Sequence, residues 1–247
     1  MSIVSVALVP AAPVIVPGLS GHTMPVPEVR SAALDAIQRM IDAGVDEVIV
    51  LAEAVRDDLL DSTAPWGLHR IGGMHTLSEP GAGVTFDQLL TVSLAIGASV
   101  LRDAGWTGTT SFYALERTMS ADAAAEVGRG LGATPRSVGL LLLGNGSACC
   151  TEKAPGSFHP QAETFNATLL TVIRQGDRAA MMELSAHDTA DQLSDVRVPL
   201  QVFAEATSGH RFLGSITFAD DFAGVYYICA TLLLDADDVR PHGATAR

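Results

Sequence analysis

Lysine is almost absent from this sequence of 247 residues. Lysine and arginine together number 15, of which only Lys153 is a lysine, whereas aspartate and glutamate number 28. The resulting net charge of −13 argues against a nucleic-acid partner, because binding to phosphates needs basic side chains that replace their counterions. An acidic surface otherwise mainly favours solubility and carries no information about the fold.

Cysteine and N-terminal charge are scarce as well. Three cysteines, two of them adjacent at Cys149 and Cys150, are too few for a disulfide framework. No charged residue precedes Glu28, yet the N-terminus lacks the positive region of a signal peptide. Three prolines interrupt the apolar residues 3–19, a stretch shorter than the ~20 residues of a spanning helix. We therefore expect a cytoplasmic, reduced protein with no membrane partner.

Apolar residues are plentiful and predict a sizeable core. They make up 48% of the chain, whereas charged residues make up 17%. The apolar runs predict strands at 3–9, 46–52, 109–115, 138–143, 211–218 and 224–234. The helical patterns lie at 27–43, 86–103, 120–131, 160–174, 177–192 and 199–206. This order predicts an α/β fold: a mostly parallel central sheet with helices on both faces and a terminal β-hairpin.

Three loops follow predicted strands at the same end of this sheet: residues 10–27, 53–83 and 144–158. In open parallel sheets, ligands bind beyond the carboxyl ends of the strands. No internal repeat, low-complexity tract or linker divides the chain, so we expect one domain over 1–247. A domain with so little charge can also self-associate, but the sequence does not set the number of subunits.

The richest of these loops reads GNGSACCTEKAPGSFHP, residues 144–160. The candidate binding residues in it are Asn145, Gly146, Ser147, Lys153 and His159. Small residues allow a ligand to approach the backbone closely, although an ordinary strand-to-helix connection has the same composition. The loop is neither a dinucleotide fingerprint, since a cysteine takes the third glycine position, nor a phosphate-binding Walker loop. Its second cysteine, Cys150, is either a reactive thiol or a buried inert one.

Metal ligands are a further possibility. His69 and His75 lie six residues apart among glycines, which is weak evidence for a ligand pair. His22 lies in the first strand-end loop. Glu53 directly follows the second predicted strand, where its carboxylate either lines the cleft or serves as an acid at a helix N-terminus.

Four segments in order resemble the actinobacterial LigB-like proteins of the class III extradiol ring-cleavage dioxygenase superfamily, to which Memo-like proteins are related. These segments are VPAAPVIVPG, SLAIGASVL, LLLLGNGSACCTEKAPGSFHPQAETFNATL and FAGVYYICATLL. The resemblance covers nearly the whole chain, and its most specific part is G-x-G-S-A followed by E-K-A-P-G. This branch usually has Asp in place of Asn145.

The resemblance implies an α/β fold and, in active members, Fe(II) held by two histidines and a carboxylate, with a further histidine as acid/base. The first ligand histidine of the family falls at Ala11. The second falls at Glu53 or one of its neighbours, and the acid/base position falls at Cys149 or Cys150. Asp195 and Glu205 are the candidates for the carboxylate ligand. Alanine has no lone pair for a metal, so the implied iron site is degenerate.

Three hypotheses follow. The leading one is a LigB-like protein that has lost the iron triad, needs no cofactor, and binds a small molecule or performs altered chemistry at the strand ends. The alternative is a working Fe(II) dioxygenase with shifted ligands, such as His22, Glu53 and a late carboxylate. The third is a non-catalytic interaction protein of the Memo-like kind.

Overall fold

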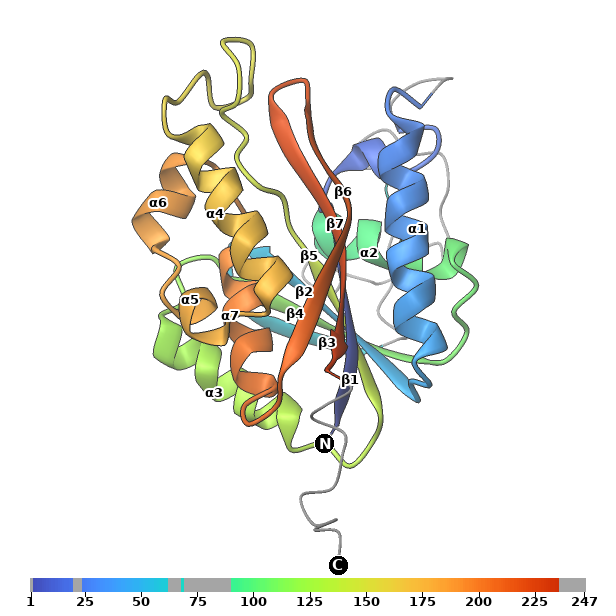
Figure 1. Ribbon diagram of the computed structural model, residues 1–247. Helices are drawn as coiled ribbons and strands as arrows, with labels where there is room; N and C mark the ends of the chain where they lie inside the picture. The colour runs from blue at the N-terminus through green and yellow to red at the C-terminus, as the bar shows by residue number, and fades with distance from the viewer. Residues whose placement is uncertain (1, 20–23, 62–67, 69–89, 236–247) are drawn as a thin grey trace, which may run out of the picture.

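The protein is built around one seven-stranded mixed sheet (Figure 1). The computed structural model describes residues 2–19, 24–61, 68 and 90–235. The strand order across the sheet is β3-β4-β2-β5-β1-β7-β6. The strands are β1 (Ile3–Val9), β2 (Glu47–Ala54), β3 (Asp58–Asp61), β4 (Thr109–Glu116), β5 (Val138–Leu143), β6 (Phe212–Phe222) and β7 (Val225–Leu234). The four central strands β4, β2, β5 and β1 are parallel, and β3, β7 and β6 pair antiparallel at the two edges.

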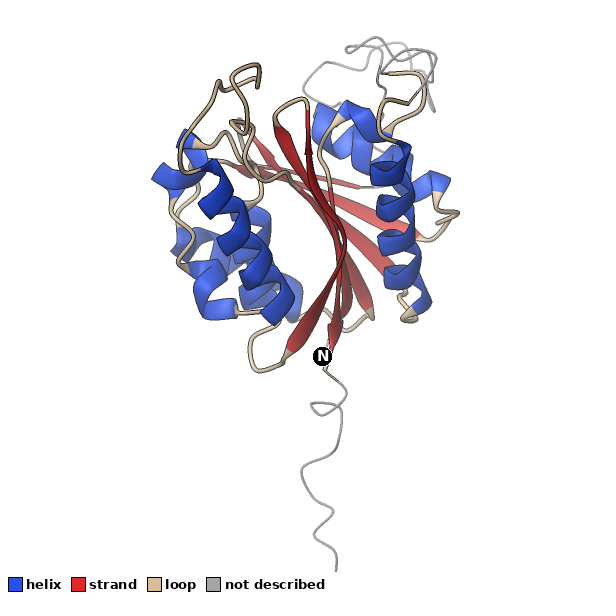
Figure 2. Cartoon of the chain, turned by 45° about the horizontal axis from the view of Figure 1, so that its top comes forward, coloured by secondary structure: helices blue, strands red, loops and turns tan. Residues whose placement is uncertain are grey.

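Helices cover both faces of the sheet (Figure 2). The helices α1 (Pro27–Asp42) and α2 (Val92–Asp103) pack on one face, together with a short 3-10 turn at Pro13–Ile15. The other face carries α3 (Ala121–Gly132), α4 (Ala162–Gln175), α5 (Arg178–Met182), α6 (Ala186–Asp191) and α7 (Arg197–Ala206). The predicted fold class, with its mostly parallel core and terminal hairpin, is therefore confirmed.

Strand alternation divides the core into two apolar clusters, one on each face. In β2, Val48 and Val50 belong to the cluster under α1 and α2, whereas Ile49 and Leu51 belong to the cluster under α3, α4 and α7. This follows from the two-residue period of a strand, which sends successive side chains to opposite faces. The same alternation decides which way each residue at the strand ends points.

Local signals explain where several helices begin and end. Pro27 occupies the first turn of α1, and Gly44 follows its end with a φ of +81°, a conformation that favours glycine. Ser120 caps α3 through a side chain that accepts from the Ala123 N–H. Gly97 lies inside α2 because the helix packs closely on the sheet: a Cβ there would come within 2.7 Å of a Leu143 methyl.

The structure departs from the predicted elements in several places. The segment predicted as one helix over 177–192 is two short helices, because Asp177 and Ser185 each cap a new N-terminus. The predicted loop after 52 contains β3, which pairs with β4. The second strand extends to Ala54, so Glu53 is part of the strand rather than the first residue after it. Among the described helices, none is long and apolar enough to cross a membrane.

Candidate functional site

The face under α1 and α2 ends in alanines. Ala52 and Ala54, the last residues of β2 on this face, are buried in its apolar cluster. Ala11, which follows β1, is half-buried and packs against the same cluster. These are the positions where the family resemblance places the first ligand and, with Glu53, the second. None of the three alanines has a side-chain atom that can bind a metal.

Glu53 points to the opposite face. Its Oε1 accepts a hydrogen bond of 3.1 Å from the backbone N–H of Val198, in the first turn of α7. The pKa of Glu53 is raised to about 7: burial has the largest effect and the nearby charge of Asp195 adds to it, whereas the Val198 hydrogen bond opposes both. Glu53 thus lies at the N-terminal end of α7, where its carboxylate accepts a backbone N–H, and not at the start of a helix that follows β2.

Asp195 holds the beginning of the glycine-rich loop. Its Oδ1 accepts from the backbone N–H of Asn145 at 2.6 Å and from the Asn145 side-chain Nδ2 at 3.2 Å. Burial raises the pKa of Asp195 to about 6, against the opposing effect of these hydrogen bonds. The Oδ1 atom of Asn145 is buried without a hydrogen-bond partner among the described residues. Glu53, Asn145 and Asp195 thus form one polar cluster, called the strand-end cluster below.

Two arginines flank the strand-end cluster. The buried guanidinium of Arg197 donates to the backbone carbonyls of Arg117 and Met119, at 2.6 and 3.1 Å, and so ties the end of β4 to α7. The charge of Arg117, which is exposed, lowers the pKa of both Glu53 and Asp195. The cluster therefore combines two carboxyl groups that titrate near neutrality with positive charge close by.

Glu205, the other candidate for the late carboxylate, lies elsewhere. It pairs with Arg129 and Arg178 at N–O distances of 3.5 and 3.8 Å, near the C-terminal end of α7. Seven residues of helix separate it from Val198, which corresponds to about 10 Å along the axis. Of the two candidates, only Asp195 lies beside Glu53.

The glycine-rich loop is held by a continuous hydrogen-bond network. Ser147 N–H donates to Asn166 Oδ1 at 2.9 Å, and its buried hydroxyl donates to Gln192 Oε1 at 2.7 Å. The amide nitrogen of Gln192 lies 2.7 Å from His159 Nδ1. Gly146 is required here, because a Cβ would lie 2.6 Å from Asn166 Oδ1. The loop is thus a fixed structure that orients the His159 ring.

The adjacent cysteines point to different partners. The Cys149 thiol is buried and donates to the Asp191 carbonyl at 3.6 Å. The half-buried Cys150 thiol donates to the Ser147 carbonyl and accepts from Asn166 Nδ2, each at 3.6 Å. Burial raises the pKa of both thiols, so neither is an activated thiolate. All three cysteines are free.

A cavity of about 340 Å³ lies beside this loop and is called the loop cavity below. It is enclosed by the loop itself, the first half of α4 and the tip of the β6–β7 hairpin, all at one end of the molecule in Figure 1. Its lining residues are Cys150, Phe158, His159, Pro160, Ala162, Glu163, Asn166, Ala167, Leu170, Asp221 and Tyr226. Lys153 is exposed in the same loop but is not one of them.

The loop cavity unites two of the predicted site residues, Cys150 and His159, and adds others that the sequence does not reveal. Asn166 and Tyr226 lie in segments that carry the family resemblance, yet nothing in their spacing shows that they meet. The sequence places His159 at the start of a helix, but α4 begins three residues later. The His159 carbonyl accepts from the Ala162 N–H, and its ring turns to Gln192.

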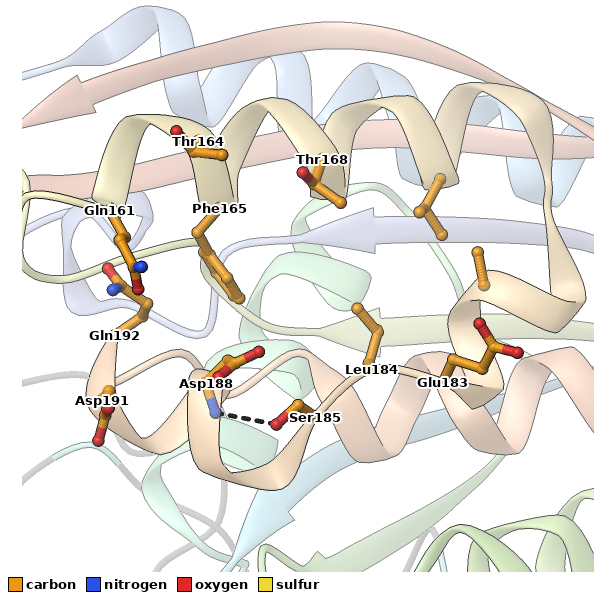
Figure 3. A pocket seen from close by; sticks show the side chains of 12 residues that line it. Gln161, Thr164, Phe165, Thr168, Glu183, Leu184, Ser185, Asp188, Asp191 and Gln192 are labelled. Carbon is orange, nitrogen blue, oxygen red and sulfur yellow. Dashed lines mark hydrogen bonds between the residues drawn. The ribbon is translucent and has the colours of Figure 1, made fainter.

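A larger cavity of about 490 Å³ lies between α4 and the α5–α6 segment (Figure 3). Figure 3 shows Thr164, Phe165 and Thr168 of α4 on one side and Leu184, Ser185 and Asp188 on the other. It holds none of the predicted site residues. Gln192 also lines it and contacts His159, which lines the loop cavity.

The remaining predicted ligands, His22, His69 and His75, lie outside the described residues. Within the described part of the chain, no group of three or more His, Cys, Asp or Glu side chains is arranged to hold a metal ion.

Comparison with known proteins supports the fold and no more. No family model matches the chain, and no curated protein matches it. A solved structure described as an uncharacterised protein, JW3007 from Escherichia coli K12, is similar with a TM-score of 0.54 and 13% identity. The match covers 93% of this chain and 99% of that one. At this identity, the likeness extends to the whole fold but not to a function.

Proposed function

We propose that this protein is a LigB-like protein without an iron triad that binds a small organic molecule in the loop cavity. The observation that carries the proposal is the alanine end of the α1–α2 face. Ala11 takes the place of the family's first ligand. Ala52 and Ala54, the neighbours of Glu53 in the strand, are the residues that face this side. The nearest carboxylate, Glu53, is directed to α7 instead.

Fe(II) does not fit the described residues. A facial triad needs two histidines and a carboxylate around one point. The strand-end cluster supplies two carboxyl groups and an amide, and one of the carboxyl groups is engaged by the Val198 N–H. The thiols at the acid/base position are held in the protonated form by burial, which raises the pKa of each.

Binding in the loop cavity rests on its shape and lining. Its volume lies within the range of ~300–1,000 Å³ that is common for ligand pockets. Apolar walls from Phe158 and Leu170 accompany a few polar groups from His159, Asn166 and Tyr226. The network through Ser147 and Gln192 holds the imidazole in place before a ligand arrives, which lowers the ordering cost of binding.

Oxygen consumption tests the loss of dioxygenase activity. Protein reconstituted with Fe(II) under anaerobic conditions is supplied with catechol and oxygen, and oxygen uptake is followed. We expect no uptake above that of free Fe(II). Catechol-dependent uptake at a rate proportional to protein would overturn the proposal.

The coupled carboxyl groups Glu53 and Asp195 favour one second candidate, a dioxygenase with shifted ligands that include His22. This candidate predicts that His22→Ala and Glu53→Gln each abolish iron binding. Equal iron content in the original protein and both variants would eliminate it.

A further inference from the structure

The lining of the loop cavity has an excess of negatively charged side chains. Glu163, at the start of α4, and Asp221, near the tip of the β6–β7 hairpin, both line it. Neither carboxylate forms an ion pair with any residue in the described ranges. No lysine or arginine is among the lining residues.

Together with burial, this charge raises the pKa values of two side chains that line the cavity, Cys150 and Tyr226. After burial, the charge of Asp221 is one of the causes that raise the pKa of the Cys150 thiol. Asp220 and Asp221 likewise raise the pKa of Tyr226, beyond the effect of burial and against the lowering effect of Arg174. Asp221 is therefore near both the thiol and the phenol, and the cavity is unfavourable for an anion.

The remaining walls are suited to a flat apolar group. Phe158 is 52% exposed although it is a large aromatic side chain, and it lines the cavity together with Tyr226 and Leu170. Aromatic faces attract rings and also cations, through the negative charge on the face of the ring. A ligand with both an aromatic ring and a positive charge would use every part of this lining.

We infer that the loop cavity binds a small aromatic amine in its protonated form. The ammonium group would lie near Asp221 and Glu163, and the ring against Phe158 and Tyr226. This inference rests on the proposed function, because it names the ligand class of the same cavity.

Three probes that share a phenylethyl group and differ in charge distinguish the contribution of the charge from that of the ring. They are 2-phenylethylamine (cationic), 2-phenylethanol (neutral) and 3-phenylpropionate (anionic). Dissociation constants are measured by calorimetry at low salt. We expect the order amine, then alcohol, then acid. Because exposed ion pairs contribute little, Asp221→Asn or Glu163→Gln should weaken amine binding about threefold each, and the double variant about tenfold. Binding of the alcohol should stay unchanged.

A charge-matched control lies away from the cavity. Asp122→Asn on α3 removes the same charge from an exposed position and should leave all three affinities unaltered. Alkylation of Cys150 shows whether the amine binds in this cavity, because Cys150 is half-buried and lines it, whereas Cys149 and Cys229 are buried. Bound amine should protect Cys150 from iodoacetamide in the original protein.

The following results would contradict the inference. Equal affinity for amine and alcohol, tighter binding of the acid, or no binding of any probe would overturn it. The inference would also be overturned if the double variant bound the amine as tightly as the original protein, or if bound amine did not protect Cys150. If the alcohol binds and protects Cys150 without an advantage for the amine, the cavity remains the binding site and only the ligand class is wrong. Failure of the proposed function is read separately, from catechol-dependent oxygen uptake.

Discussion

The two faces of the sheet differ most at the carboxyl ends of its parallel strands. Under α1 and α2, the strands end in Ala11, Ala52 and Ala54. Under α4 and α7, they end in Glu53 and Asn145, which meet Asp195 from the segment before α7, beside a loop that presents His159 and Cys150. Among the described residues, the polar side chains at these strand ends therefore lie on the second face.

The sharpest contrast lies between neighbouring residues of β2. Ala52→Asp would bury an unpaired carboxylate in the α1–α2 cluster, so we expect a loss of roughly 3–5 kcal/mol in the free energy of unfolding. Urea denaturation measures it. Glu53→Gln is the matched control, because the glutamine oxygen can still accept from Val198 N–H. Equal destabilisation by the two changes would contradict the assignment of these residues to opposite faces.

The rigidity of the glycine-rich loop is tested by Gly146→Ala. The added methyl would lie 2.6 Å from Asn166 Oδ1 and 3.1 Å from the Tyr226 ring, so we expect a loss of about 2 kcal/mol. Gly130→Ala in α3 is the control, since nothing lies within 4 Å of its added methyl and alanine is the better helix former. Gly130→Ala should raise the free energy of unfolding by about 0.5–1 kcal/mol, measured by thermal or urea denaturation. A Gly146→Ala protein as stable as the original would show that the network is adaptable.

The carboxyl groups of the strand-end cluster predict an unusual pH dependence. Burial raises the pKa of Glu53 from 4.5 to about 7 and that of Asp195 from 3.8 to about 6. The folded state therefore holds protons that the unfolded state has released, so stability falls as pH rises from about 4 to 7.5. For Glu53 this loss is of the order of 3 kcal/mol. Urea midpoints across this range measure it.

Glu53→Gln isolates the contribution of Glu53 to this curve. The variant should lose the part of the slope between pH 4.5 and about 7 and be more stable than the original protein above that range. An unchanged slope would place the Glu53 carboxyl in water.

The smallest expected effect concerns the thiols. Cys150 is half-buried, whereas Cys149 and Cys229 are buried, so iodoacetamide should modify Cys150 first. Because burial raises its pKa, modification should be slower than that of a free thiol at about pH 8 and should accelerate as the pH rises further. Peptide mass spectrometry locates the label. Faster labelling of Cys149 would contradict the described loop.

Much of the fold could be predicted because its signals are local. The run Val138–Leu143 is wholly buried, and its composition alone indicates a central strand. The four residues of β3 give no such signal, since only pairing with β4 defines them. The direction of the side chains at the end of β2 could not be predicted. The sequence indicated a carboxylate near the cleft, but only the alternation within the strand shows that Glu53 faces α7.

The site was only partly predictable for a similar reason. The composition of residues 144–160 indicated a functional loop, and the cavity beside it contains Cys150 and His159. Gln192 and Asp195, which hold that loop, lie 45 residues after Ser147 and 50 residues after Asn145. No spacing rule connects them to the loop, because the contact depends on how α6 and α7 pack against it.

Iron stoichiometry tests the central claim most directly. The protein of residues 1–247 is incubated anaerobically with excess Fe(II), desalted under argon and analysed by inductively coupled plasma mass spectrometry, with Ala52→Ser as a reference variant. We predict far less than one iron per chain in both proteins, because the α1–α2 face offers alanines where ligands are needed. One tightly held iron per chain in the original protein would contradict the account.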